Sequence, residues 1–118
     1  MEPRGQKYHR ERLGEALKEE IETIVEGELG DPRIGLAAVT AVELASDGRS
    51  ARVLVMVHGS EEECSRSMEG LAAAVGFIRR ELAERLHLRR CPELFFQLDR
   101  SESFNARVNE LLKRTKKG

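Results

Sequence analysis

The sequence predicts an α+β fold, a two-layer sandwich in which helices cover one face of a three-stranded sheet. Three observations indicate it. A long stretch with apolar residues at helical spacing opens the chain, two runs rich in β-branched residues follow, and a second helical stretch precedes a short apolar run. The chain has 118 residues, which suits one domain with one core. We therefore expect a single domain over residues 1–118 that ends in a short basic tail at about 113–118.

The first helix is expected from about Lys7 to Leu29. Gly30 follows as a suitable C-cap, and Asp31-Pro32 stops the helix. Glu is the most frequent residue outside the apolar stripe, so one face is expected to be buried and the other exposed. The stripe recurs at steps of three and four and consists of Leu13, Leu17, Ile21, Ile24, Val25 and Leu29.

A hairpin of two strands is expected next, from "RIGLAAVTAVELASDG" and "SARVLVMVHG". Both runs are rich in β-branched residues, and Ser46-Asp47-Gly48 between them is a turn signal. The second strand, from Ala51 to Val57, is apolar at nearly every position. It should therefore be the central strand.

A second helix is expected to begin after Ser60, a good N-cap, with three Glu in the first turn at 61–63. Gly76 interrupts this helix, and a third helix follows from Phe77 to about His87. Pro92 ends that region, and "ELFFQLD" predicts a third strand. The segment 99–102 resembles a capping box for a final helix. The stripe of that helix is Phe104, Val108, Leu111 and Leu112, and "KRTKKG" follows it as a basic tail.

This order, α-β-β-α-kink-α-β with a C-terminal helix, is that of a type II KH domain. In KH domains the junction between the two central helices normally carries a GXXG loop that clamps a nucleic-acid backbone. Here the junction reads Ala74-Val75-Gly76. A glycine inside a helix costs about 1 kcal/mol relative to alanine, so we expect a bend or a close backbone approach there.

A bend would leave the first amides of the next helix open to an anion such as phosphate. Arg79 and Arg80 lie in that first turn, where positive charge opposes the helix dipole unless something negative docks. The positive region continues through Arg85, Arg89 and Arg90. The alternative is a kink that only lets two helices pack over the sheet, with arginines on a solvated surface.

A net positive charge is found in three short zones, although the net charge of the whole chain is −1. Counted from the sequence, residues 1–12 carry +2, residues 76–92 carry +3 and residues 107–118 carry +4, against −8 over 13–75 and −2 over 93–106. The three zones could form one positive face on an otherwise acidic protein. They could equally be solvated helix faces.

The chain resembles the ribosome-binding factor A family, bacterial factors for maturation of the small ribosomal subunit. The resemblance covers roughly residues 5–113. It rests on "RERLGEALKEEIETIVEGEL", "DPRI", "VTAVELASDGRSARVLVMV", "LAAAVGFIRRELAERLHLRRCPELFFQLD" and the closing helix. In that family an Ala-x-Gly kink replaces GXXG, which is similar to Ala74-Val75-Gly76. Gly48 departs from the family, which usually has an apolar residue at that turn, and the tail after the last helix is short.

We expect a monomer in the cytoplasm. The resemblance implies a ribosome biogenesis factor that binds the immature 30S subunit and its rRNA near the neck. It also implies a role in late maturation and 5′-end processing of 16S rRNA, most important in the cold, and release assisted by a ribosome-dependent GTPase. Transferred to this sequence, the kink falls on Ala74 and Gly76, followed by Arg79 and Arg80. A second RNA-lining zone is expected at the chain's start, at Arg4, Lys7, Arg10 and Arg12.

Enzymatic activity is not expected. His9, His58 and His87 are scattered without partners at helix or strand spacing, and no Walker loop, dinucleotide fingerprint or zinc pattern is present. The sequence therefore predicts no cofactor and no metal. The N-terminus lacks the apolar segment of a secretory signal, and we expect Cys64 and Cys91 to be free thiols of a cytoplasmic protein.

Two other functions remain open. A general KH-type binder of single-stranded RNA would need a GXXG loop, which is absent here. A protein-interaction α+β module would use the acidic first helix, and its association would not depend on Arg79 and Arg80.

Overall fold

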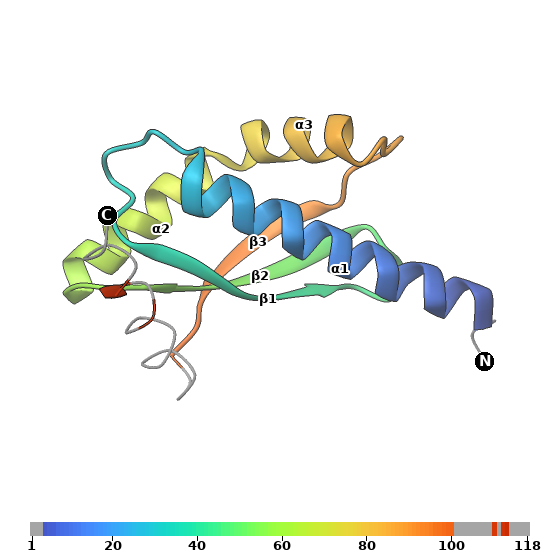
Figure 1. Cartoon of the computed structure of the whole chain (residues 1–118), viewed down its shortest axis with the longest axis horizontal. Coiled ribbons are helices and arrows are strands. Elements are labelled where there is room, and N and C mark those ends of the chain that lie inside the picture. The colour runs from blue at the N-terminus through green and yellow to red at the C-terminus, as the bar shows by residue number, and fades with distance from the viewer. Residues whose placement is uncertain (1–3, 101–109, 111, 114–118) are drawn as a thin grey trace.

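The computed structural model describes residues 4–100, 110 and 112–113, with side chains from His9 onward. Three helices and a three-stranded sheet form two layers, with the helices on one face of the sheet (Figure 1). The predicted type II KH-like fold is confirmed. Of the predicted final helix, residues 110 and 112–113 are helical, and the rest lies outside the described residues. The elements are α1 (Arg4–Gly27), β1 (Ala37–Leu44), β2 (Ser50–Val57), α2 (Glu61–Ala73), α3 (Val75–Arg85) and β3 (Glu93–Leu98).

The sheet has the order β1-β2-β3, so the apolar β2 is the central strand, as predicted. β1 pairs with β2 antiparallel, and β3 pairs with β2 parallel. The register of β1 shifts between Val39 and Ala41, which leaves Thr40 as an extra residue of a β-bulge. The Thr40 hydroxyl lies 2.6 Å from a carboxylate oxygen of Asp99, just after β3. This contact ties the bulge of one edge strand to the end of the other.

The core lies between the sheet and the helices because alternate residues of β2 point toward them. α1 packs along β1 with Leu17, Ile21 and Ile24 fully buried. α2 and α3 contribute Leu71, Ile78 and Leu82, also without exposed surface. The helical stripe and the strand alternation of the sequence therefore meet in one cluster of buried residues.

The bounds of α1 differ from the prediction. The helix begins before Lys7 and ends at Gly27, before the expected cap at Gly30. Among the described glycines only Gly48 and Gly59 have positive φ, so Gly30 does not form the left-handed cap that the sequence suggested. The loop after α1 is instead fixed by Asp31, whose carboxylate accepts a hydrogen bond from the backbone N–H of Arg33 at 2.9 Å.

The start of α2 agrees with the prediction. The Ser60 hydroxyl accepts from the amide of Glu63, and the Glu63 carboxylate accepts from the amide of Ser60, each at 3.1 Å. Gly59 precedes this capping box with φ +136°, and a Cβ there would lie 3.0 Å from the Glu63 side chain. Farther along, α2 packs closely on the loop after α1, since a Cβ on Gly70 would lie 2.6 Å from Cγ1 of Ile34.

The other face of the sheet carries fewer apolar groups. Phe95 of β3 is 57% exposed there, one of two exposed large apolar side chains in the described part of the chain. Arg52 pairs with Glu43 at 2.7 Å across β1 and β2. A small second cluster joins Ala38 and Met56 to Leu112, so the described C-terminal residues contact this face.

Candidate nucleic-acid interface

The α2–α3 junction is a break in the helical path at Ala74, one residue before α3 begins. Ala74 ends α2 and also occupies the N-cap position of α3, with φ −85° and ψ −5°. Its methyl group cannot accept a hydrogen bond from the first amides of α3. The two helices are separate ribbons with different directions (Figure 1). The predicted kink is therefore present, two residues before Gly76, which lies in the first turn of α3.

Gly76 is exposed, and a Cβ added to it would meet no atom within 4 Å. No close approach within the described protein therefore requires a glycine at this position. Beside it, Ala72, Ala73 and Phe77 are also exposed, and Phe77 retains 38% of its surface. Phe77 is not among the residues that the sequence predicts to bind RNA. Its position one residue before the buried Ile78 was the available signal, because adjacent residues of a helix face different sides.

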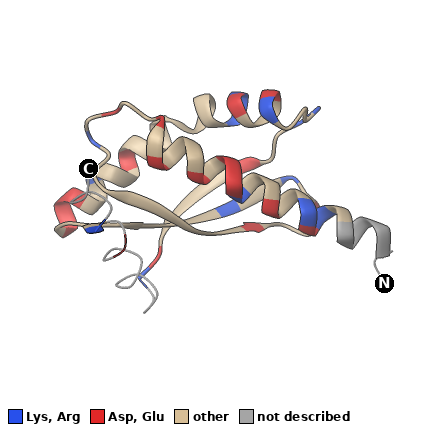
Figure 2. Cartoon of the chain, in the orientation of Figure 1, with Lys and Arg blue, Asp and Glu red and all other residues tan. Residues whose placement is uncertain are grey.

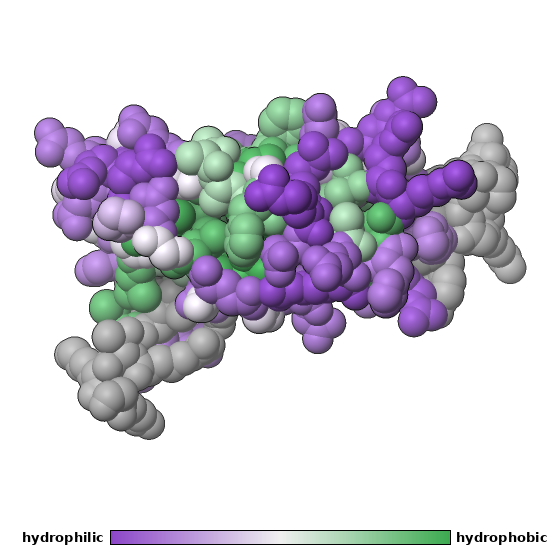
Figure 3. Space-filling model, turned by 90° about the horizontal axis from the view of Figure 1, so that it is seen from above, coloured by the Kyte–Doolittle hydropathy of each residue, from purple (hydrophilic) through white to green (hydrophobic). Residues whose placement is uncertain are grey.

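The helical side of the molecule combines apolar and charged surface. Apolar residues gather near the middle of this side, and hydrophilic residues surround them (Figure 3). The exposed residues Ala72, Ala73 and Gly76 are small, so they leave the surface of the junction low. A partner can therefore approach the main chain there more closely than it can along most of a helix.

Arg79 is half-buried and turned toward the segment that connects α3 to β3. Its Nη2 donates to the carbonyl oxygen of Cys91 at 2.7 Å, and its Nε donates to that of Pro92 at 3.0 Å. Burial raises the pKa of the Cys91 thiol, and the nearby Arg79 partly opposes this rise. In the free protein Arg79 therefore holds the connection in place.

Arg80, Arg89 and Arg90 are exposed. None of the three forms a hydrogen bond or an ion pair within the part of the chain that the structure describes. Arg80 lies on α3, four residues after Gly76, and the other two lie in the α3–β3 connection. Their charges are therefore available to a partner such as phosphate.

Arg85, by contrast, faces carboxylates. Its guanidinium binds Glu28 and reaches Glu81 at 3.0 Å and Glu20 at 3.4 Å. The hydrogen bond from Arg85 lowers the pKa of Glu28, and the three carboxylates together raise the pKa of Arg85. This cluster joins α3 to α1, so the charge of Arg85 is already balanced within the protein.

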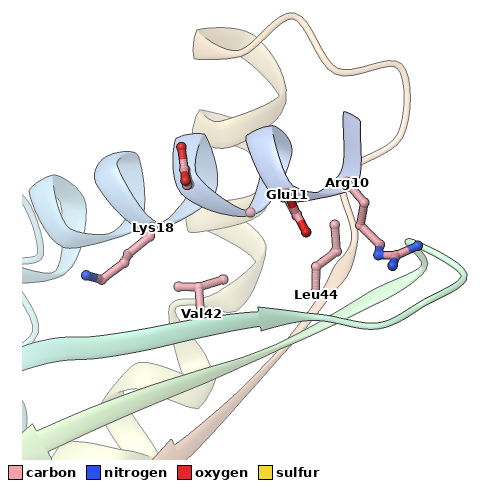
Figure 4. Close-up of a pocket in the computed structure, with 7 residues that line it drawn as sticks. Arg10, Glu11, Lys18, Val42 and Leu44 are labelled. Atoms are coloured by element: carbon pink, nitrogen blue, oxygen red, sulfur yellow. The ribbon is translucent and has the colours of Figure 1, made fainter. Parts of the chain in front are cut away.

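The N-terminal zone lies at the start of α1. The backbone of Arg4 and Lys7 is helical, but their side chains lie outside the described set. Arg10 donates to the carbonyl oxygen of Ser46 in the β1–β2 turn at 3.3 Å, and Arg12 is exposed. Below them, a shallow groove of about 350 Å³ separates α1 from β1. Arg10 lies at the end of this groove beside the turn, with Glu11 and Lys18 on α1 and Val42 and Leu44 on β1 (Figure 4).

The residues predicted to bind RNA therefore do not all lie together in the structure. The junction and the first turns of α1 are apart, because α1 begins beside the hairpin turn and the junction lies at the start of α3 (Figure 1). Arg89 and Arg90 lie at the far end of α3, which is about 16 Å from the junction at 1.5 Å per residue. The basic residues that could form one positive face are therefore spread along α3 and toward the hairpin.

The model of the ribosome-binding factor A family matches residues 9–112. The chain belongs to this family. It is 61% identical over 117 residues to ribosome-binding factor A of Koribacter versatilis, covering 99% of this chain and 95% of the relative. It is 49% identical over 105 residues to that of Halothermothrix orenii, covering 89% and 86%. The family resemblance inferred from the sequence is confirmed.

Solved structures of ribosome-binding factor A have the same fold. The crystal structure from Thermus thermophilus matches with a TM-score of 0.59 and 33% identity, over 82% of this chain and 98% of that one. Coordinates of the Thermus thermophilus factor fitted into the cryo-EM map of a 30S complex match with a TM-score of 0.57 and 33% identity. That comparison covers 79% of this chain and 93% of the other.

Ribosome-binding factor A is not a known class of enzyme. In the described ranges no three His, Cys, Asp or Glu residues come together as a metal site. Cys64 and Cys91 are both buried and free, as expected. None of the described helices is long and apolar enough to cross a bilayer.

Proposed function

We propose that this member of the ribosome-binding factor A family is a non-enzymatic assembly factor that binds the immature 30S subunit through its 16S rRNA. The observation that supports it most directly is the junction, where Gly76 is exposed although no contact requires a glycine, and Arg80, four residues later, has no carboxylate partner among the described residues. An exposed main chain next to a free guanidinium suits the phosphate backbone of RNA. The 30S complex of the Thermus thermophilus relative supports the choice of partner.

The proposed interface runs along α3. Ala74 and Gly76 allow the RNA backbone to approach, and Arg80, Arg89 and Arg90 supply charge. Arg4, Lys7, Arg10 and Arg12 form the second zone at the start of α1. Arg79 and Arg85 already have partners in the free protein. Arg79 donates to backbone carbonyl oxygens, and Arg85 binds carboxylates. Direct contact of either one with RNA would have to use the N–H groups that these bonds leave free.

The proposed role in the cytoplasm is late maturation of the small subunit, including 5′-end processing of 16S rRNA, with the greatest effect in the cold. The factor acts as a monomer and leaves the subunit with the help of a ribosome-dependent GTPase. It requires no cofactor, since binding and guarding of RNA involve no chemical step.

The test is sedimentation of the protein with purified immature 30S subunits at two salt concentrations. Wild type should co-migrate and dissociate steeply as salt rises, because phosphate contacts release counterions. Arg80→Glu should weaken co-migration, whereas Arg66→Glu should not. Arg66 is a matched control, since it is exposed on α2 and has no hydrogen bond or ion pair in the described structure. Equal co-migration of both variants would contradict the interface.

A cellular experiment separates binding from processing. In cells that lack their own ribosome-binding factor A, the wild-type chain should restore mature 16S 5′ ends at low temperature, as measured by primer extension. Arg80→Glu should leave precursor ends, and Arg66→Glu should behave as wild type. Full restoration by Arg80→Glu would argue against the proposed role of the junction in processing.

A further inference from the structure

The β1–β2 turn and the α3–β3 connection lie at the same end of the molecule. The amide of Glu93, the first residue of β3, donates to the carbonyl oxygen of Arg49 in the turn at 2.9 Å. Arg89 and Arg90 precede Glu93 by only a few residues. The hairpin turn is therefore bonded to the start of β3, three residues after Arg90, although Arg49 and Arg89 are 40 residues apart in the sequence.

Each of these segments is held in a defined position. The turn is closed by hydrogen bonds from Gly48 to Ala45 and from Ala45 to Ser50, at 2.9 and 2.8 Å. The Asp47 carboxylate accepts from the amide of Arg49 at 3.0 Å. The connection is held by Arg79 through the carbonyl oxygens of Cys91 and Pro92. The cationic side chains are thus mounted on fixed backbone, which reduces the entropy lost on binding.

The charges at this end are available. Arg49, Arg89 and Arg90 are exposed, and no hydrogen bond or ion pair within the described residues uses their guanidinium groups. Asp47 and Glu93 also lie here, but neither forms an ion pair with these arginines in that part of the chain. Positive positions follow α3, the connection and the strands toward the start of α1 (Figure 2).

We propose that Arg49 extends the interface along α3: together with Arg89 and Arg90 it forms a second phosphate-binding surface for ribosomal RNA, at the opposite end of α3 from the α2–α3 junction. This inference rests on the proposed function and adds the hairpin turn to the interface. The RNA backbone that meets the junction continues past the far end of α3 and ends on the turn. Two contact points about 16 Å apart fix the direction of the RNA on the protein, which one cluster at the junction cannot do.

RNA suits this end better than a protein partner. Protein interfaces depend on a buried apolar or aromatic centre, and the end offers guanidinium groups around a tight polar turn. The two exposed large apolar residues of the described structure, Phe77 and Phe95, belong to the junction helix and to the middle of β3. Arginines without an apolar anchor match the phosphate contacts that position nucleic acid.

The test compares Arg49→Glu with Arg66→Glu in equilibrium binding to purified immature 30S subunits across a salt series. Both variants change the charge by the same amount at an exposed arginine without a described partner. Arg49→Glu should weaken binding by about tenfold and reduce the slope of log affinity against log salt by about 1, the change expected for one lost phosphate contact. Arg66→Glu should alter neither quantity.

Arg49→Ala removes the charge without reversing it and should weaken binding by about threefold. Thermal unfolding of all three variants should match wild type, because neither arginine supports the fold through a side-chain bond in the described structure. If Arg49→Glu and Arg66→Glu have the same affinity and salt slope, the second surface is refuted. The same result is expected if this end binds an acidic protein outside the subunit and not RNA. Failure of wild type itself to bind subunits would instead contradict the proposed function.

Discussion

The Nη2 of Arg79 lies 2.7 Å from the carbonyl oxygen of Cys91, across the space between α3 and the segment that leads into β3. The same guanidinium reaches the carbonyl oxygen of Pro92. An arginine that is next to the kink in sequence therefore supports the backbone that carries Arg89 and Arg90. We expect Arg79 to be a positioning residue, one that affects RNA binding through the connection that it holds.

Substitution of Arg79 should release the connection. In a Cys64→Ser background, Arg79→Gln should increase the alkylation rate of Cys91 severalfold, since the thiol is 7% exposed and becomes accessible when the connection moves. Subunit binding should weaken at the same time, because Arg89 and Arg90 lose their fixed positions. Alkylation with iodoacetamide, followed by mass spectrometry, measures the first effect.

Arg79→Lys distinguishes support from direct RNA contact. Lysine keeps the positive charge but has no planar fork to bond both carbonyl oxygens. We expect Cys91 to react faster in Arg79→Lys than in wild type, with weaker binding. Wild-type reactivity together with lost binding would instead identify Arg79 as a direct ligand of RNA.

Gly76→Ala should separate stability from binding. The added Cβ meets no atom, and Gly76 does not have a positive φ, so alanine should stabilise α3 by about 0.5–1 kcal/mol. If the RNA backbone approaches this glycine, the same methyl group should weaken subunit binding by about tenfold. Urea unfolding and co-sedimentation measure the two effects.

Gly14→Ala is the matched control for this experiment. Gly14 lies inside α1, and a Cβ there also meets nothing within 4 Å. It opens onto the groove beneath α1 and not onto the junction. We expect a similar gain in stability with unchanged binding. A Gly76→Ala protein that is stabilised and still binds as wild type would show that RNA does not approach this position.

Gly70→Ala should destabilise the fold. A Cβ at this position would lie 2.6 Å from Cγ1 of Ile34, which cannot move away as the end of a long side chain can. Overpacking costs about 1–3 kcal/mol and exceeds the gain in helix propensity of under about 1 kcal/mol, so we expect a net loss of about 1–2 kcal/mol. Ile34→Ala should remove the clash, and a double-mutant cycle by urea unfolding should give a favourable coupling. Additive effects would contradict the contact.

Much of the fold follows from the sequence because its signals are local. The stripe of α1, the apolar run of β2 and the N-cap Ser60 each act within a few residues, and the structure has all three. The end of α1 was predicted less well. The sequence predicts Gly30 as the cap, but the helix ends at Gly27, and the loop after it is fixed by the hydrogen bond from the amide of Arg33 to Asp31 and by the packing of Ile34 against Gly70.

The partners of the arginines could not be read from the sequence. Arg79, Arg80 and Arg85 share one helix and look alike in a charge count. The structure turns Arg79 onto a neighbouring connection, Arg85 onto carboxylates of α1 and Arg80 toward solvent. Which surface a helical side chain meets depends on packing between distant segments. For the same reason the sequence does not indicate Arg49 as a binding residue, because its turn meets β3 only in the folded chain.

Acid should weaken the loop after α1 in a defined pH range. The side-chain hydrogen bonds from Arg33, and then its backbone amide, lower the pKa of Asp31 from 3.8 to about 2. Because the folded pKa lies below the unfolded one, the contribution of Asp31 is complete above about pH 3.8 and disappears as the pH falls toward about 2. The difference in urea midpoint between wild type and Asp31→Asn should therefore be constant at higher pH and shrink across this range.

Direct titration checks the cause. The carboxyl carbon of Asp31, followed by NMR, should titrate with a midpoint of about 2 in wild type. In Arg33→Gln the midpoint should rise only part of the way to 3.8, because the backbone amide of residue 33 still donates to the carboxylate at 2.9 Å. A wild-type midpoint near 3.8 would mean that the Asp31–Arg33 pair does not persist in solution. The loop that carries Ile34 against α2 would then have to be held by the Ser67 hydroxyl, which accepts from the amide of Gly35 at 3.0 Å.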